Sequence, residues 1–278
     1  MNIKAYAKVN LALDVCGRRP DGYHTVRMVM QRISLCDEIT LARADHGVAL
    51  TCSDRALPCG EANLAYRAAA LFLARTNAAG GVTIHLEKRI PSQAGLGGGS
   101  ADAAAVLRGM DALFETRLPV DTLMAWGLEL GADVPFCIAG GTALAEGIGE
   151  KLTALPAVSC THLVILKPDG GISTPAAYGA IDALHPAPHA DVDGVIAALG
   201  DPKTLAVCME NVFEPVAIAQ IPEIGWCKNR LLELGADGAM MTGTGSAVFG
   251  VFPSQAAAQA AFAALQCAPY RVFLAHTL

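Results

Sequence analysis

Alternation of apolar and polar residues dominates the first part of the chain. Residues 3–16 alternate and are rich in Ile, Val, Leu and Ala, which predicts a β-strand. Two further strands are predicted at 26–35 and 37–41, and another at 82–86, where apolar and polar residues alternate clearly. Apolar residues at helical spacing predict a helix over 62–75. The first third of the chain therefore combines strands with helices.

Turn-forming residues separate these elements. The sequence Arg-Pro-Asp-Gly at 19–22 has strong turn chemistry, because Pro presets φ, Asp bonds its own backbone and Gly accepts positive φ. A glycine-rich run, 95–99, follows the strand that ends at 90–91. Ser100 is expected to be a helix N-cap, with an apolar stripe behind it as far as Phe114. The glycines therefore lie between a strand and the start of a helix.

The remainder of the chain continues this mixture. A short helix capped by Asp121 is predicted to end near Gly131, and strands are predicted at 136–139 and 142–146. Residues 147–160 lack strong periodicity, so a domain boundary is placed there. Beyond it we expect strands at 162–166, 238–241, 246–252 and 270–275, and helices at 174–183, 191–199, 204–217, 222–234 and 254–266. This arrangement predicts α+β domains rather than strict βαβ alternation.

Composition favours a folded protein with a large core. The chain has 278 residues, 53% of them hydrophobic and 17% charged, so disorder is not expected. The formal charge of −6 argues against a general nucleic-acid binder. An anionic ligand is still compatible with it, because backbone N–H groups and a few cations can hold phosphate in an acidic protein.

Other features of the sequence concern its compartment. There are nine cysteines, an odd number without a CxxC pair, which predicts reduced and mostly buried thiols in a reducing compartment. The N-terminus lacks the layout of a signal peptide, and no apolar run reaches the ~18 residues needed to span a bilayer. We therefore expect a cytoplasmic protein that does not enter a membrane.

The glycine run is the strongest chemical signal. Glycines let the backbone approach a ligand closely, and N–H groups at a helix N-terminus favour an anion. The run is not a P-loop, because no lysine follows Gly99, and Ser100 stands where a dinucleotide fingerprint needs its third glycine. We interpret it as a phosphate cradle of another kind, the alternative being a flexible turn without a ligand.

Other candidate residues each have two interpretations. Lys8 lies in an apolar strand, where it needs an anionic partner unless it points to solvent. Asp133 could orient or deprotonate a substrate hydroxyl, or it could form a turn with its own backbone. Tyr23 and His24 could present their rings to a ligand or be ordinary surface residues. The segment 241–246 could close over a ligand or form a tight turn.

Together these segments resemble the GHMP kinase superfamily over most of the chain. The matching segments are 7–11, 19–24, 91–104, 131–136, 147–150 and 242–245. The glycine run indicates the superfamily. Asp-Gly-Tyr-His at 21–24 and Gly-Ala-Asp-Val-Pro-Phe at 131–136 narrow the resemblance to members that phosphorylate the 2-hydroxyl of 4-diphosphocytidyl-2-C-methyl-D-erythritol in non-mevalonate isoprenoid biosynthesis.

The resemblance implies a two-domain α+β fold with the active site in the cleft between the domains. Residues 1–152 would form the N-terminal ATP-binding domain and 153–278 the C-terminal domain. Lys8 and Asp133 would be the catalytic pair. Substrate contacts are expected from Asn10, Tyr23, His24 and Tyr178. The residues expected to wrap the ATP phosphates are Pro91, Ser92, Gln93, Ala94, Gly95, Leu96, Gly97, Gly98, Gly99, Ser100 and Ala101.

The cofactors and partners follow from the same resemblance. ATP would be accompanied by Mg²⁺ held chiefly by ATP oxygens and water, and the protein ligands of the metal are unknown. Asn63 is expected near the adenosine. Asp102 would repel phosphate if it faced it, so it is expected to point away or to meet the metal through water. Partners are ATP and a cytidyl diphosphate sugar alcohol, with no nucleic acid or membrane, and the protein is expected to be a monomer or homodimer.

Three alternatives stay open at this point. Another GHMP-type kinase, acting on homoserine or mevalonate, would share the glycine run but not need Tyr23, His24 and Tyr178, which suit a planar base. A nucleotide-binding regulator without catalysis would not need both Lys8 and Asp133. A nicotinamide oxidoreductase is disfavoured because the dinucleotide fingerprint fails.

Overall fold

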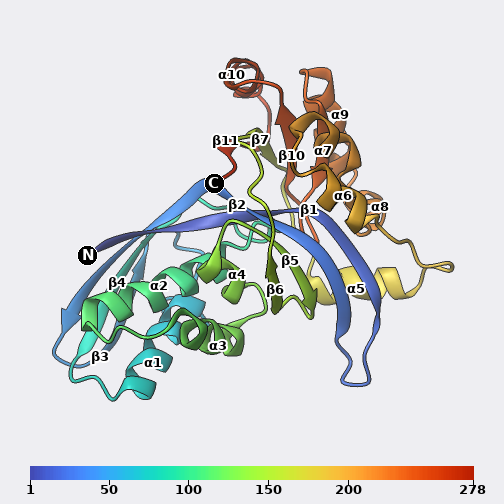
Figure 1. The fold of residues 1–278 in the computed structure, drawn as a ribbon. Helices are drawn as coiled ribbons and strands as arrows, with labels where there is room; N and C mark the ends of the chain where they lie inside the picture. The colour runs from blue at the N-terminus through green and yellow to red at the C-terminus, as the bar shows by residue number, and fades with distance from the viewer. The chain divides into compact units, whose positions relative to one another are not determined.

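A computed structural model describes residues 1–278, and the chain forms two compact units, each built from several segments (Figure 1). Unit 1 contains Met1–Ala7, Cys36–Ser92 and Gly97–Gly140, and unit 2 contains Lys8–Leu35, Gln93–Leu96 and Gly141–Leu278. Each unit contains both strands and helices, which confirms the α+β class. The boundary between residues 152 and 153 stays a prediction.

Two long strands contribute residues to both units. These are β1 (Asn2–Arg18) and β2 (His24–Ala44). Separate strands at 26–35 and 37–41 were the expectation, but β2 is continuous. Buried and less buried residues change phase between Ser34 and Asp37, and no Gly or Pro interrupts the backbone there. A shift in side-chain alternation was therefore mistaken for a break in the strand.

Unit 1 packs helices on a small sheet. Strand β4 (Gly81–Glu87) pairs antiparallel with residues 38–44 of β2 and parallel with β3 (Gly47–Cys52), a short strand that the sequence pattern did not reveal. The helices are α1 (Leu64–Thr76), α2 (Gly98–Phe114), α3 (Val120–Leu130) and α4 (Val134–Ala139), which pack against one another. Helix α1 also contacts β3 and β4. Gly109 lets α2 lie close to β2, because a Cβ there would collide with the Leu41 side chain.

Three expectations about unit 1 were wrong. Residues 136–139 belong to helix α4, not to a strand. A short apolar run does not by itself distinguish helix from strand, and Pro135 in the first turn favours a helix start. Ser100 is not the N-cap of α2, since Gly97 occupies that position in a left-handed conformation and Ser100 lies in the first turn. Likewise Pro119, and not Asp121, caps α3.

Unit 2 contains two groups of strands. Strand β5 (Thr142–Gly147) pairs antiparallel with residues 26–31 of β2 and with β6 (Lys151–Ala154), which lies in the stretch that lacked periodicity. Strand β8 (Glu210–Asn211) pairs parallel with β1. A separate antiparallel sheet has the order β11-β7-β10-β9, formed by Arg271–His276, His162–Lys167, Val248–Phe252 and Gly238–Met241.

Six helices complete unit 2. They are α5 (Thr174–Asp182), α6 (Val192–Ala198), α7 (Pro202–Cys208), α8 (Glu214–Gln220), α9 (Glu223–Glu233) and α10 (Gln255–Ala264). Helices α9 and α10 pack on the four-stranded sheet (Figure 1). A single helix over 204–217 was the expectation, but Met209 turns extended, β8 follows, and α8 begins at Glu214 with Pro215 in its first turn. Proline is tolerated in a first turn and not in a helix interior, so the helix is divided here.

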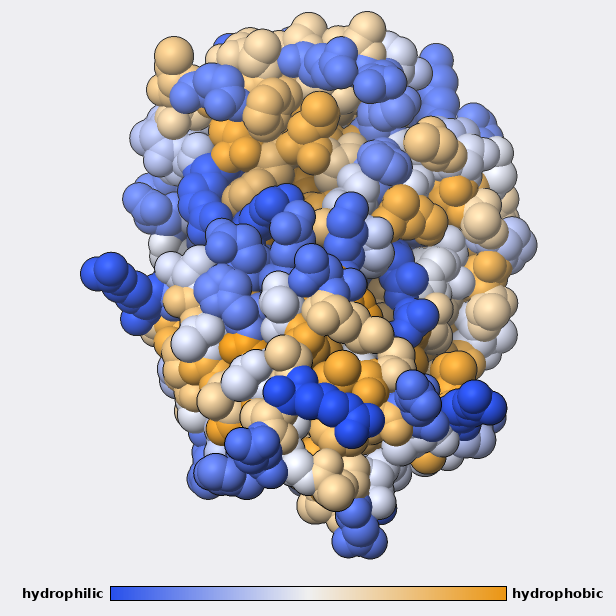
Figure 2. All heavy atoms as spheres, turned by 90° about the vertical axis from the view of Figure 1, so that its left-hand side faces the viewer, coloured by the Kyte–Doolittle hydropathy of each residue, from blue (hydrophilic) through white to orange (hydrophobic).

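Polar and apolar residues are mixed on the molecular face in Figure 2. Exposed apolar groups are normal in a chain that is 53% hydrophobic, because polar residues cannot cover the whole surface. The cysteines were expected to be mostly buried, but of the nine only Cys36 and Cys227 are buried. None of the helices combines the length and apolar character needed to span a lipid bilayer.

Candidate active site

The second half of the glycine run begins helix α2 in unit 1. Gly97 has φ 70° and ψ 21°, and its carbonyl accepts the first intrahelical hydrogen bond, from the N–H of Ala101 at 2.8 Å. The first N–H groups of a helix have no partner within it. Here they belong to Gly98, Gly99 and Ser100, so small residues surround the positive end of the helix dipole. This geometry suits an anion such as phosphate.

The first half of the run packs against another loop in unit 2. Gly95 has φ +75°, and a Cβ on it would lie well under 3.0 Å from the Thr242 carbonyl oxygen. The Thr242 hydroxyl donates to the Gly95 carbonyl at 3.3 Å. Gly245 N–H donates to Thr242 O at 3.1 Å, so the segment 241–246 contains the tight turn that the sequence favoured. The backbone of this turn, at Thr242 and Gly243, lies directly against Gly95; we call it the backbone platform beneath Gly95.

Lys8 is buried beside the same loop. Its side chain is only 5% exposed, which rules out the solvent-pointing interpretation. Its backbone N–H donates to Leu96 O at 3.0 Å, so β1 is tied directly to the glycine run. The ammonium Nζ donates to Oδ1 of Asn10 at 2.8 Å. Lys8 thus contacts the glycine run through its backbone and Asn10 through its side chain.

Asn10 is the centre of a hydrogen-bonded group that we call the Asn10 cluster: Lys8, Asn10, Gly95, Thr242 and Gly243. The Asn10 side chain is 0% exposed. Besides Lys8, its Oδ1 accepts from the Gly243 N–H at 3.1 Å, and its backbone N–H donates to the Thr242 hydroxyl at 3.0 Å. These contacts fix the amide and thereby orient the Lys8 ammonium. Direct contact between Asn10 and a substrate stays a prediction.

Asp133 immediately precedes helix α4 in unit 1. The N–H groups of Val134 and Cys137 are satisfied by the carbonyls of Gly131 and Asp133, both at 3.1 Å. The Asp133 carboxylate makes no capping hydrogen bond to α4. The pairing of Asp133 with Lys8, which belongs to unit 2, stays a prediction.

All four expected substrate residues lie in unit 2, and two of them, His24 and Tyr178, contact each other. Tyr23 follows the turn at the tip of the β1–β2 hairpin and is 62% exposed. The His24 ring, whose side chain is 9% exposed, stacks on Tyr178 with centroids 4.5 Å apart and planes at 22°. Phe213 packs edge-on against Tyr178 at 4.9 Å. The hairpin therefore carries one exposed and one enclosed aromatic group.

The comparisons with known proteins cover the whole chain. A model for the GHMP kinases N terminal domain matches residues 63–141, and one for the GHMP kinases C terminal matches 195–272. The 4-diphosphocytidyl-2-C-methyl-D-erythritol kinase of Acetivibrio thermocellus is 44% identical, covering 100% of this chain and 99% of the relative. The enzyme of that name from Clostridium acetobutylicum is 42% identical with 100% of both chains covered. The chain belongs to the GHMP kinase family.

Solved structures agree with that assignment. A crystal structure of 4-(cytidine 5'-diphospho)-2C-methyl-D-erythritol kinase has a TM-score of 0.86 at 38% identity, covering 100% of this chain and 99% of the other. A homoserine kinase from Cytophaga hutchinsonii has a TM-score of 0.78 at 22% identity, covering 100% and 94%. The second likeness shows a shared fold. A GHMP kinase is an ATP-dependent small-molecule kinase, which excludes the nicotinamide oxidoreductase.

Sequence reasoning missed a partner of His24 in this kinase. Asp182 accepts from His24 Nε2 at 2.8 Å, and Arg18 approaches the other carboxylate oxygen at 3.7 Å. Tyr178 and Asp182 are four residues apart on helix α5, so both can contact one ring. An aromatic residue followed at i+4 by a carboxylate was the available signal.

A buried group of charges in unit 1 was also missed, and we call it the Lys88 cluster: Asp37, Lys88 and Asp102. Lys88 Nζ forms ion pairs with Asp37 and, at 2.6 Å, with Asp102. Burial raises the pKa of Asp102 to about 7, with Lys88 opposing and Asp37 assisting the increase. Burial would lower the pKa of Lys88, but the two carboxylates outweigh it and raise that pKa. The role of Asp102 is therefore tied to Lys88.

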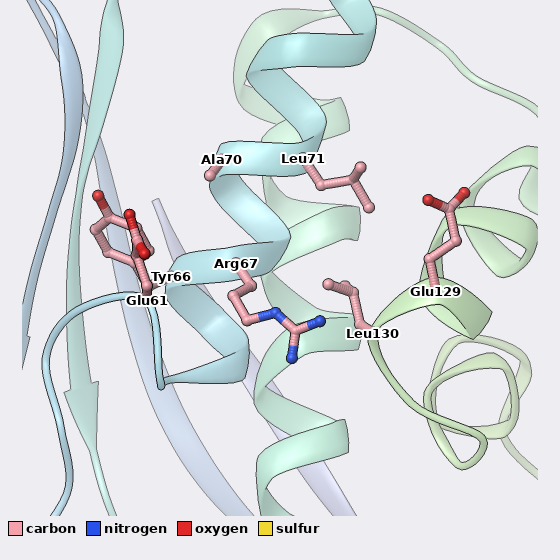
Figure 3. A pocket seen from close by; sticks show the side chains of 7 residues that line it. All are labelled: Glu61, Tyr66, Arg67, Ala70, Leu71, Glu129 and Leu130. Carbon is pink, nitrogen blue, oxygen red and sulfur yellow. The ribbon is translucent and has the colours of Figure 1, made fainter.

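Asn63 has a structural role in this kinase. Its Oδ1 caps helix α1 by accepting from Ala65 N–H at 2.9 Å, and its Nδ2 donates to Pro58 O at 2.8 Å. A cavity of about 470 Å³ lies nearby, along α1 and the end of α3 (Figure 3). It is lined by Glu61, Tyr66, Arg67, Ala70, Leu71, Glu129 and Leu130. None of the predicted site residues lines it, and contact between Asn63 and adenosine stays a prediction.

Proposed function

We propose that this chain transfers the γ-phosphoryl group of ATP to the 2-hydroxyl of 4-diphosphocytidyl-2-C-methyl-D-erythritol, giving its 2-phosphate and ADP in non-mevalonate isoprenoid biosynthesis. The observation that carries this is full-length similarity to kinases named for that substrate, at 44% and 42% identity. The glycine run at the start of α2 supplies the phosphate-binding geometry that such a reaction requires. The cytoplasm stays the expected location.

The residues around Gly97 fit the triphosphate of ATP. The helix start offers N–H groups and a positive dipole end, and Gly98 lets it pack closely against Ile90, since a Cβ there would lie 3.0 Å from the Ile90 side chain. No group of three His, Cys, Asp or Glu side chains could hold a metal by itself. Mg²⁺ would therefore be bound mainly by ATP oxygens and water, and it would neutralise phosphate charge.

Asp133 and Lys8 are the proposed catalytic pair. The oxygen of the substrate hydroxyl bonds to the γ-phosphorus, and Asp133 accepts the proton of that hydroxyl. The bond between the γ-phosphorus and the β–γ bridging oxygen breaks, and ADP leaves. Lys8 stabilises charge on the transferring group. Asn10 supports this step by holding the Lys8 ammonium at 2.8 Å. Catalysis then consists mostly of positioning and electrostatic stabilisation, as expected for a loose transition state.

The cytosine is assigned to the hairpin tip. Tyr23 is exposed and available for stacking, and His24 carries polar nitrogens beside it. Tyr178 already stacks on His24, so a base that stacks on Tyr178 either replaces the imidazole on that face or uses the opposite face. Either arrangement makes the base, and not the sugar alcohol alone, a requirement for tight binding.

A substrate panel tests the proposed function. Purified protein with MgATP is given diphosphocytidyl-methylerythritol, homoserine or mevalonate, and ADP release is followed by a coupled assay. We expect ADP release with the first compound only. Faster release with homoserine or mevalonate would assign another GHMP kinase activity. ATP binding without ADP release from any of them would support the non-catalytic regulator.

A further inference from the structure

The Lys88 cluster lies at the start of the helix that is proposed to bind phosphate. Asp37 comes from β2, Lys88 from the residue after β4, and Asp102 from the second turn of α2. Lys88 Nζ is 3.7 Å from the place where a Cβ on Gly98 would stand. The ammonium is thus beside the first residue of α2. All three side chains are at least nine-tenths buried, so solvent screens them little.

The cluster holds two carboxylates and one ammonium. Asp37 has further donors, because the N–H groups of Arg89 and Ile90 both bond to its Oδ1. Asp102 has no such support: its Oδ2 accepts from Lys88 at 2.6 Å, and its Oδ1 is buried without a hydrogen-bond partner. Lys88 is therefore the main compensation for Asp102. Without it, a buried carboxylate would stand near the N–H groups of Gly98 and Gly99 and oppose an incoming anion.

The same lysine also connects two segments mechanically. Asp37 holds the backbone at 89–90, which leads into the glycine run, while Asp102 belongs to the helix that follows the run. Lys88 joins these two carboxylates and so fixes both ends of the turn. A phosphate cradle needs its N–H groups held in place before the ligand arrives, since preorganisation reduces the cost of binding.

We propose that Lys88 is a positioning residue for the ATP phosphates, which holds the start of α2 and cancels the charge of Asp102 beside it. This inference rests on the ATP-binding part of the proposed function. It separates the roles of two lysines: Lys8 acts on the transferring group, whereas Lys88 acts through Asp102 and the helix. Its effect must therefore grow with the negative charge of the nucleotide.

Calorimetric titration of ATP, ADP and adenosine, at a pH above the pKa of about 7 of Asp102, with Mg²⁺ and without the sugar alcohol, tests this proposal. Replacement Lys88→Met should lower the affinity for ATP by roughly tenfold or more, the affinity for ADP by less, and the affinity for adenosine least. Lys88→Arg keeps the charge and should retain most of the affinity. In the double variant Lys88→Met with Asp102→Asn, the buried negative charge is removed together with its partner, so ATP should bind more tightly than to Lys88→Met, but less tightly than to the parent, because the link through Lys88 is still missing.

The proposal is overturned if Lys88→Met loses affinity for adenosine and for ATP by the same factor, which would indicate a general loss of structure. Unchanged ATP affinity in a folded Lys88→Met protein would overturn it as well. If that variant does not fold, Asp102→Asn alone decides: ATP should bind at least as tightly as to the parent, and a marked loss would contradict the charge argument. Wild-type protein that binds ATP but does not phosphorylate the sugar alcohol would defeat the proposed function and leave this inference standing.

Discussion

Lys8 and Lys88 are both buried, yet their surroundings differ. Lys8 donates to a neutral amide in the Asn10 cluster, where the other hydrogen bonds join backbone groups and a hydroxyl. Lys88 is held between two carboxylates. Two carboxylates commit the Lys88 ammonium to the structure, whereas the Asn10 amide orients the Lys8 ammonium for its proposed action on the transferring group. The surroundings of a buried lysine therefore indicate its role more clearly than its burial does.

The largest expected effect separates the two lysines kinetically. Replacement Lys8→Met should lower kcat by roughly 10²–10³ with little change in ATP affinity, because the group acts on the transition state. Lys88→Met should instead mainly raise the KM for ATP. Steady-state kinetics with diphosphocytidyl-methylerythritol measures both. A kcat loss of the same size in both variants would remove the distinction, and near-normal turnover in Lys8→Met would defeat its catalytic role.

The glycine run gives the second comparison, this time in stability. Ala at Gly95 meets the Thr242 carbonyl far inside contact distance and also requires φ +75°, whereas Ala at Gly99 meets only Leu64 Cδ1 at 3.4 Å. We expect Gly95→Ala to cost about 3 kcal/mol or more in free energy of unfolding, and Gly99→Ala less than about 1 kcal/mol. Urea denaturation measures both variants. Equal costs would show that the backbone platform beneath Gly95 is not rigid.

Much of this architecture was predictable because its signals are local. The alternation at 82–86 and the glycine run specify a strand, a loop and a helix start within a short stretch of sequence. Local signals failed where a run of only a few residues had to distinguish a helix from a strand. At 136–139 the apolar run is part of helix α4. They also failed at 204–217, where β8 and Pro215 divide the predicted helix.

The candidate site shows the same limit. Resemblance to a family identified Lys8 and Asn10, which are two residues apart, and the structure brings their side chains together. Lys88 is 51 residues from Asp37, so only the pairing of β2 with β4 brings them together. Asp102, which looked like a possible source of repulsion, could be understood only once this partner was known. Long-range charge pairs are the part that periodicity and spacing do not reveal.

A pH series tests the ionisation of Asp102 in the Lys88 cluster. The pKa of Asp102 is raised from 3.8 to about 7 in the folded protein. Between these values the folded state keeps a proton that the unfolded chain has released, so this group's contribution to stability is greatest near pH 4 and declines toward pH 7. Asparagine cannot ionise. The stability of Asp102→Asn relative to the parent should therefore rise from pH 4 to pH 7, by about 1–3 kcal/mol.

Chemical denaturation at several pH values measures that difference. Thr242→Ser is the control from the Asn10 cluster, since it changes no ionisable group, and its difference from the parent should not vary with pH. A constant difference for Asp102→Asn would contradict the raised pKa. A pH-dependent difference for Thr242→Ser would instead mean that the two clusters do not differ in this respect.

The smallest expected effect concerns the hydroxyl of Thr242 in the Asn10 cluster. This hydroxyl accepts from the Asn10 N–H at 3.0 Å and donates to the Gly95 carbonyl at 3.3 Å, and the residue is fully buried. Valine has nearly the same shape but leaves both groups unpaired, so Thr242→Val should cost about 1–3 kcal/mol, whereas Thr242→Ser should cost less. Denaturation measures stability, and kcat reports on Lys8, whose orientation depends on Asn10. A stable Thr242→Val protein with normal kcat would show that Asn10 orients Lys8 without help from this turn.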